Sequence, residues 1–120
     1  MDKVLIVDND PDILALMNLT LTTHGYKVEA TANWESIDSS ISSFSPDLIL
    51  LDITLGGADG RDICKRIKTS EKTKHIPVIL FSANVEMEQS MHDCGAQAFI
   101  SKPYNLQDLL STIRHNIKKH

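Results

Sequence analysis

Short apolar runs, each followed by apolar residues at helical spacing, are the feature that most constrains the fold of this chain. The runs cover Lys3–Val7 and residues 26–30, 48–51, 76–81 and 98–100. Residues 48–51 are apolar on both faces of the predicted strand, which is typical of a central strand in a parallel sheet. Parallel strands need crossover connections, and a helix follows each run. The pattern predicts an α/β fold with a doubly wound, five-stranded parallel sheet between two layers of helices.

Five helices are expected, and local signals mark their ends. Asp10 is the expected N-cap of the first helix, with Pro11 in its first turn and Gly25 after its end. Asn33 is the expected cap of the second helix, and Asn84 opens a fourth helix that ends at Gly95. The apolar residues expected to face the core are Ile13, Leu14, Met17 and Leu21 in the first helix, Ile37, Ile41 and Phe44 in the second, Ile63 and Ile67 in the third, Val85, Met87 and Met91 in the fourth, and Leu106, Leu109, Leu110, Ile113 and Ile117 in the fifth.

Length and charge limit the organisation and the partners. The 120 residues suit a single domain spanning 1–120, and 42% of them are hydrophobic, enough for one core. The formal charge of −4 argues against nucleic acid or a membrane as the direct partner. The sequence shows no secretory leader and no apolar run long enough to span a bilayer, so we expect a cytoplasmic protein. Cys64 and Cys94 are far apart in sequence and are expected to be reduced thiols that pack as small hydrophobes.

Polar residues follow four of the five predicted strands. They are Asp8, Asn9 and Asp10 after the first, Asp52 after the third, Ser82 after the fourth and Lys102 after the fifth. The carboxyl ends of parallel strands lie at one edge of the sheet, where open α/β sheets bind their ligands. Each residue alone has an ordinary explanation, and Asp10 is best explained as a helix cap. Asp52 is the hardest to explain in this way, because a carboxylate at the end of a buried strand needs a cation as partner.

The combination at this edge suits phosphoryl transfer onto a carboxylate. A carboxylate can act as a nucleophile and form an acyl phosphate. Mg²⁺ prefers a few carboxylate oxygens together with water and phosphate oxygens. A lysine and a hydroxyl can neutralise and hold the remaining phosphoryl oxygens.

The chain resembles response-regulator receiver domains along essentially its whole length, and the matching segments occur in the family's order. The segments are Val4-Leu5-Ile6-Val7-Asp8-Asn9-Asp10, Pro46-Asp47-Leu48-Ile49-Leu50-Leu51-Asp52, Asp59-Gly60, Ser82-Ala83 and Lys102-Pro103. The resemblance implies a flavodoxin-like, CheY-like three-layer sandwich of five strand–helix units. It also implies a signalling protein that catalyses only its own phosphorylation and dephosphorylation.

The resemblance assigns roles to particular residues. It implies that Asp52 is the phosphoacceptor, that Ser82 hydrogen-bonds the phosphoryl group and that Lys102 pairs with it. Asp8, Asn9 and Asp52, with the backbone carbonyl of Thr54, would bind Mg²⁺. Ser82 and Phe99 would form the switch: as the Ser82 hydroxyl moves toward the phosphoryl group, the Phe99 ring turns inward.

Three positions depart from the family's usual pattern. Asn9 stands where a second acid is usual, so the site has one negative charge fewer for Mg²⁺. Gly56 stands where proline is frequent, which predicts a more mobile loop after Asp52. Phe99 stands where many relatives have tyrosine, and its ring has no hydroxyl to hydrogen-bond.

The resemblance also implies the partners. A sensor histidine kinase or a histidine phosphotransfer protein would supply the phosphoryl group. A homodimer contact or a downstream protein would use the surface formed by the fourth helix, the fifth strand and the fifth helix. The sequence leaves open whether the chain acts alone or belongs to a hybrid kinase or a longer regulator.

Two other functions remain as alternatives. Asp8-Asn9-Asp10 also resembles the start of haloacid-dehalogenase phosphatases, with Asp8 as nucleophile, although the chain is short and lacks a late pair of acids. The second alternative is an interaction module with the same fold that is never phosphorylated, which Asn9 favours.

Overall fold

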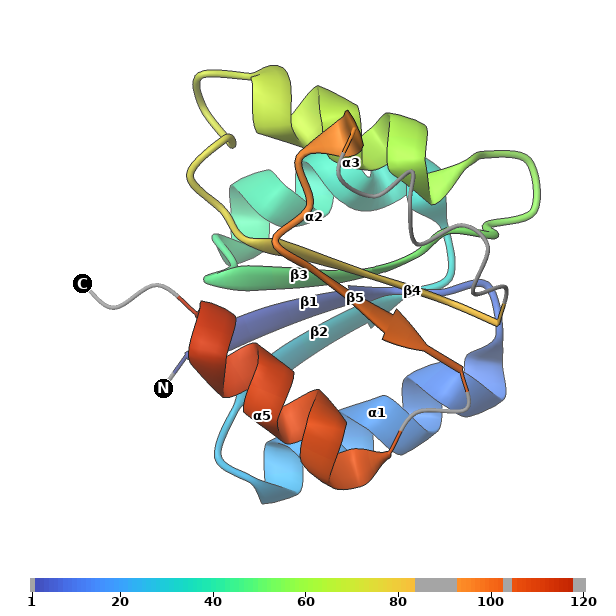
Figure 1. Ribbon diagram of the computed structural model, residues 1–120, viewed down its shortest axis with the longest axis vertical. Helices are drawn as coiled ribbons and strands as arrows, with labels where there is room; N and C mark the ends of the chain where they lie inside the picture. The colour runs from blue at the N-terminus through green and yellow to red at the C-terminus, as the bar shows by residue number, and fades with distance from the viewer. Residues whose placement is uncertain (1, 84–92, 103–104, 118–120) are drawn as a thin grey trace.

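The computed structural model describes residues 2–83, 93–102 and 105–117, in which five parallel strands form one sheet between two layers of helices (Figure 1). The strands are β1 (Lys3–Val7), β2 (Lys27–Thr31), β3 (Leu48–Asp52), β4 (Val78–Ser82) and β5 (Ala98–Ser101). The helices are α1 (Pro11–Thr23), the short 3₁₀ turn η1 (Trp34–Ser36), α2 (Ile37–Phe44), α3 (Gly60–Thr69) and α5 (Leu106–Asn116). The strand order β2-β1-β3-β4-β5 confirms the predicted doubly wound α/β fold.

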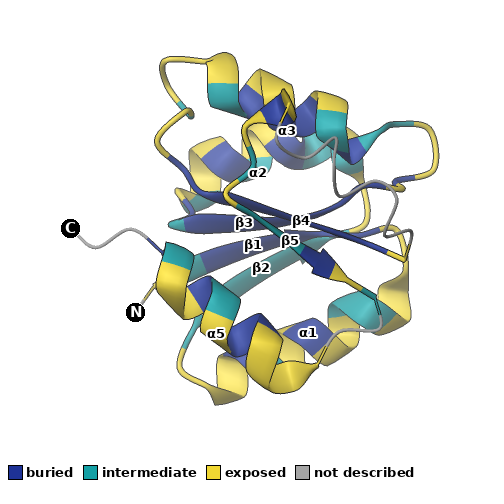
Figure 2. Cartoon of the chain, in the orientation of Figure 1, coloured by how far each residue is buried: buried dark blue, intermediate teal, exposed yellow. Residues whose placement is uncertain are grey.

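Apolar side chains on both faces of the sheet form the core (Figure 2). All residues of β3 and β4 are buried, as expected for central strands covered on both faces. One cluster packs α1 and α5 against one face, and the other packs α2 and α3 against the opposite face. After β1 the chain adds β2 on one side, and it then adds β3, β4 and β5 on the other side of β1. The direction of strand addition therefore reverses between β1 and β3, and open α/β sheets bind ligands at the carboxyl ends of the strands beside such a reversal.

Two strands begin later than predicted because turns hold their first residues. The Tyr26 N–H donates to Leu21 O at 3.0 Å and so closes the turn after α1, and β2 runs from Lys27 to Thr31 rather than over 26–30. The Ile76 N–H donates to Thr73 O, and the pairing of β4 with β3 begins at Val78 rather than at residue 76.

The cap of the first helix was predicted correctly, but the second helix starts later than predicted and one residue predicted to face the core is exposed. The Asp10 carboxylate accepts the Asp12 N–H and caps α1 as predicted. Asn33 caps the 3₁₀ turn η1, and α2 itself begins only at Ile37. Leu106 was predicted to face the core but is 42% exposed, because it is the first residue of α5 and lies at the end of the helix. The predicted fourth helix lies almost wholly outside the described residues.

The two cysteines are far apart in sequence but are neighbours in the structure. Both are buried and free, and the Cys64 thiol on α3 lies 3.5 Å from the Cys94 carbonyl oxygen. Burial and the adjacent Cys94 raise the pKa of the Cys64 thiol. Both cysteines pack in the core as small apolar residues, which agrees with the prediction.

Gly60 holds the start of α3 directly against the end of β3. A Cβ at this position would lie 2.2 Å from the Asp52 carbonyl oxygen and 2.8 Å from Ile53 Cα. The Gly60 N–H also donates to Ile53 O at 2.7 Å. Only glycine allows this approach, which fixes the backbone that follows Asp52.

No helix in the described part of the chain is long and apolar enough to cross a membrane.

Candidate functional site

Three charged side chains meet at the carboxyl edge of the sheet because strand alternation directs them to one face. In β1, Val4 and Ile6 face α1 and α5, and Asp8 follows in the same register. Asp52 follows Leu48 and Leu50 in the same way. Lys102 follows Ala98 and Ile100 of β5, which also pack on this side of the sheet. Residues that are far apart in the sequence are therefore brought to one point above the β1–β3 switch.

The Lys102 ammonium bridges the two carboxylates. Its Nζ lies 3.1 Å from Asp8 Oδ2 and 3.2 Å from Asp52 Oδ2. The Asp8 and Asp52 side chains are 0% and 5% exposed, and that of Lys102 is 20% exposed. Backbone N–H groups occupy the second oxygens: Asp10 donates to Asp8 Oδ1 at 2.8 Å, and Thr54 donates to Asp52 Oδ1 at 3.2 Å.

The charges at this site do not balance. Two carboxylates face one ammonium, so the buried group carries one excess negative charge when all three are ionised. Burial, and then the Asp8 carboxylate, raise the pKa of Asp52 against the opposing effect of Lys102. Burial alone would lower the pKa of Lys102, but Asp52 and Asp8 outweigh it and raise that pKa. The Lys102 side chain therefore stays protonated, and the remaining negative charge favours a further cation.

Phe81 belongs to the site, although the sequence indicated only a core residue. The Lys102 ammonium lies 4.9 Å from the centroid of the Phe81 ring, within the range of a cation–π interaction. Phe81 lies on β4, which separates β5 from β3 in the sheet. Lys102 must therefore cross this strand to reach Asp52. An aromatic residue one position before Ser82 was the available signal, but it acquires meaning only once the strand order is known.

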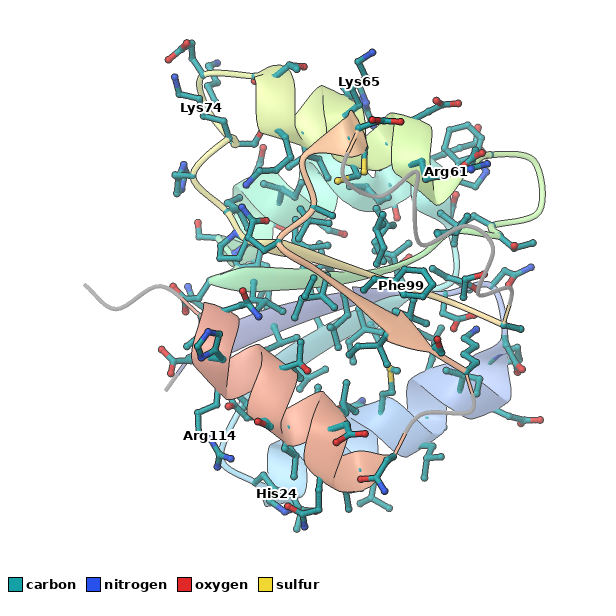
Figure 3. All side chains as sticks on the ribbon, in the orientation of Figure 1. His24, Arg61, Lys65, Lys74, Phe99 and Arg114 are labelled. Atoms are coloured by element: carbon teal, nitrogen blue, oxygen red, sulfur yellow. The ribbon has the colours of Figure 1, made fainter. Side chains whose placement is uncertain are left out.

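Ser82 and Phe99 share the other face of the sheet. Ser82 is 2% exposed at the end of β4, and its carbonyl accepts the Lys102 N–H at 2.8 Å. Strand alternation places it on the side of Leu80, and Leu80 is paired with Phe99 in the ladder. The half-buried Phe99 ring packs against the cluster under α2 and α3 (Figure 3). This arrangement is compatible with the predicted switch, whose operation remains a prediction.

Asn9 lies at the edge of this group. Its side chain is exposed, and its Nδ2 lies 3.3 Å from the position that a Cβ on Gly56 would take. Asn9 and Gly56, two of the three positions that depart from the family's pattern, are therefore neighbours. Asp10, whose carboxylate caps α1, does not replace the missing acid.

The donors at this edge fit a small, hard cation. Within the described part of the chain, no three His, Cys, Asp or Glu side chains gather as a metal site, so only Asp8 and Asp52 would supply charged ligands. Each of their four oxygens accepts one hydrogen bond in the structure and has a further lone pair. Two carboxylates with neutral oxygens and water are a donor set that suits Mg²⁺.

The sequence matches the family described as Response regulator receiver domain over residues 4–114. It is 38% identical over 120 residues to the nisin biosynthesis regulatory protein NisR of Lactococcus lactis subsp. lactis, covering 98% of this chain and 51% of NisR. It is 30% identical over 121 residues to the DNA-binding dual master transcriptional regulator RpaA of Synechocystis sp., covering 99% of this chain and 50% of RpaA. The chain thus spans about half the length of these relatives.

Solved structures show the same fold. The Vibrio cholerae chemotaxis protein CheY4 superposes with a TM-score of 0.88 at 26% identity, over 98% of this chain and 99% of CheY4. The BeF3-activated N-terminal receiver domain of Klebsiella pneumoniae RstA also has a TM-score of 0.88, at 25% identity, over 98% of this chain and 100% of that domain.

Replacing Asp52 with Asn should stabilise the fold by about 1 kcal/mol near neutral pH, because it removes the excess buried charge and leaves Lys102 paired with Asp8. The folded-state pKa of Asp52 is raised above 3.8, so its ionised form destabilises the folded state above that pH. The gain should therefore disappear as the pH falls below this value. Urea unfolding of wild type and Asp52→Asn across this pH range tests the prediction.

The exposed Asp2 offers a matched control for this measurement. Asp2→Asn should change the free energy of unfolding by less than about 0.5 kcal/mol. A wild-type protein as stable as Asp52→Asn at neutral pH would show that Lys102 already compensates both carboxylates.

Proposed function

The chain belongs to the response regulator receiver domain family, and on this premise we propose that it receives a phosphoryl group on Asp52 in two-component signalling. The observation that supports this role most is the pair of buried carboxylates joined by the Lys102 ammonium at the carboxyl edge of the sheet. The proposed donor is a phosphohistidine of a sensor histidine kinase or of a histidine phosphotransfer protein.

The side chains of the chain suit this reaction. An Asp52 carboxylate oxygen attacks the phosphorus, the P–N bond to the donor histidine breaks, and its electron pair stays on the imidazole nitrogen. Lys102 pairs with the phosphoryl oxygens, and the Ser82 hydroxyl donates a hydrogen bond to them. The reaction forms an acyl phosphate and consumes no other substrate, so the proposed catalysis is limited to the chain's own phosphorylation and dephosphorylation.

We further propose that Asp8, Asn9 and Asp52, with the Thr54 carbonyl, hold Mg²⁺. The ion, when bound, neutralises phosphoryl oxygens during transfer. The excess negative charge between Asp8 and Asp52 supports this proposal. Asn9 contributes an amide oxygen without charge, which weakens the site relative to one with a third carboxylate.

The proposed output depends on Ser82 and Phe99. Phosphorylation biases an equilibrium in which Ser82 moves toward the phosphoryl group and Phe99 turns inward. Both residues lie on the same face of the sheet, and the ladder pairs Phe99 with Leu80, two residues before Ser82. The surface that changes comprises residues 84–94, β5 and α5. We propose that this surface binds a second copy of the chain or a downstream protein, and that the chain contacts neither nucleic acid nor a membrane directly. The cytoplasmic location stays a prediction.

None of the comparisons supports a phosphatase of the haloacid-dehalogenase type. Asp10, which would be the acid/base of such an enzyme, is the N-cap of α1 and hydrogen-bonds the Asp12 N–H. The buried Asp8 and Asp52 carboxylates joined by Lys102 favour phosphoacceptor signalling over an interaction module that is never phosphorylated.

Incubation with acetyl phosphate or phosphoramidate and Mg²⁺ should add one phosphoryl group to the wild-type protein. Asp52→Asn should abolish the added mass in intact-protein mass spectrometry, because it removes the nucleophile. Asp12→Asn, which changes an exposed carboxylate on α1, should label like wild type. The phosphatase mechanism would instead be indicated if Asp52→Asn still labelled while Asp8→Asn abolished turnover.

Asn9→Asp should bind Mg²⁺ more tightly than wild type by about 1 kcal/mol, because it adds a negative charge beside Asp8 and Asp52. Isothermal titration with Mg²⁺ measures the difference. Asn18→Asp, which makes the same charge change on the exposed side of α1, should leave the affinity nearly unchanged. Equal or weaker binding by Asn9→Asp would exclude residue 9 from the metal site.

Beryllofluoride, a mimic of the phosphoryl group, should shift NMR resonances beyond the edge of the sheet. We expect changes across residues 84–110 as well as near Asp52, because Ser82 and Phe99 link the two regions. Asp52→Asn should show no such changes under the same conditions. Shifts confined to the surroundings of Asp52 would mean that the proposed coupling is absent.

A further inference from the structure

Basic residues concentrate in one segment of this acidic protein. Residues 65–75 contain five of the chain's twelve Lys and Arg residues and a single acid, Glu71. This gives the segment a formal charge of +4 with His75 neutral, and since the whole chain carries −4, the other residues carry −8. The segment covers the second half of α3 and the turn that leads to β4.

The exposed basic residues of this segment form a surface, which we call the basic patch, made of Lys65, Arg66, Lys72, Lys74 and His75. Lys68 is half-buried, and its ammonium donates to Ile76 O at 2.8 Å. Arg66 pairs with Asp38 at 2.6 Å, and Lys74 pairs with Glu71 at 3.0 Å. Among the described residues, Lys65 and Lys72 have no ion-pair partner. Lys65 and Lys74 project outward from the α3 layer (Figure 3). The patch therefore offers positive charge that the chain itself leaves uncompensated.

A cleft opens at one end of the basic patch. It encloses about 280 Å³ between the end of α2 and the turn before β4. Four apolar residues contribute to its lining, namely Ile41, Pro46, Ile76 and Pro77, and Lys72 and His75 line it as well. Its one acid, Asp47, already accepts the Lys3 N–H at 2.8 Å. The cleft lies at the amino ends of β3 and β4, at the opposite edge of the sheet from Asp52.

We propose that the cleft and the basic patch dock an acidic segment of a partner protein, one in which an apolar side chain stands beside carboxylates. The apolar lining suits a single apolar side chain, and Lys72 and His75 suit the carboxylates next to it. The uncompensated charge of Lys65 and Lys72 would attract such a segment from solution.

The size of the patch favours a short peptide over other anionic partners. Nucleic acid would extend past the patch toward the acidic remainder of the chain, where Glu35 and Asp62 line a neighbouring cleft with Trp34. Among the described residues, no Phe, Tyr or Trp lines the cleft beside the patch to stack on a base. A membrane surface would meet the same acidic residues around a small basic area. A short peptide can contact the cleft and the patch alone.

Fluorescence anisotropy with a labelled peptide of alternating Glu, Asp and Leu residues tests the proposal on the whole chain. We expect saturable binding that weakens as salt is added, because the contact is partly electrostatic. Replacing Leu with Ser in the peptide, at unchanged charge, should weaken binding because the cleft is left empty. Lys72→Glu should weaken it by about fivefold to tenfold, as expected for reversal of one interfacial charge.

Lys27→Glu is the matched control, since it reverses an exposed lysine on β2 outside the patch. If Lys27→Glu weakened peptide binding as much as Lys72→Glu, the loss of affinity would be due to the net charge of the protein, and the proposal would be overturned. Absence of binding, or equal binding of the Ser peptide, would also overturn the proposal.

Other partners are distinguished by the same assay. Tighter binding to duplex DNA or to anionic phosphatidylserine vesicles would assign the patch to those partners. Self-association that is lost in Lys72→Glu would assign it to a second copy of the chain. None of these outcomes bears on phosphorylation of Asp52, which is measured separately by mass.

Discussion

The Lys102 ammonium between Asp8 and Asp52 is the interaction on which the functional edge of this protein depends. Without it, two buried carboxylates would face each other in a site almost closed to water, which is strongly unfavourable. With it, one negative charge remains uncompensated. Burial, and then this uncompensated charge on Asp8, raise the pKa of Asp52. The remaining negative charge also favours a cation or a reaction that engages the carboxylate. The excess negative charge therefore affects both the free energy of unfolding and the reactivity of the Asp52 carboxylate.

The sheet positions this interaction with little help from flexible segments. Strand alternation directs all three side chains to one face, and Lys102 crosses β4 over the Phe81 ring. Gly60 packs against the Asp52 carbonyl, so α3 holds the backbone at the end of β3. The opposite face carries Ser82 and Phe99, on the side of α2 and α3. A change at Asp52 thus has a short path through the sheet to the other layer of helices.

Charge is distributed unevenly between the two ends of the sheet. The carboxyl edge has the excess of acid around Asp52, whereas the amino ends of β3 and β4 lie beside the cleft that Lys72 and His75 line. The two regions share no residue. The proposed phosphorylation of Asp52 and the proposed docking of an acidic segment therefore use different residues, so substitutions can test each one separately.

Features of the protein that depend on local residue order were predictable from the amino-acid sequence. The apolar runs predicted five parallel strands, and because parallel strands end at one edge, the sequence also predicted that Asp8, Asp52 and Lys102 lie near one another. The cap at Asp10 was predictable because a cap bonds only its own helix. Three contacts became visible only in the folded chain: Lys102 crosses Phe81 to bridge both carboxylates, Cys64 contacts Cys94, and the basic patch borders an apolar cleft. Each of these contacts joins elements distant in the chain, so each depends on strand order and helix packing, which no local pattern encodes.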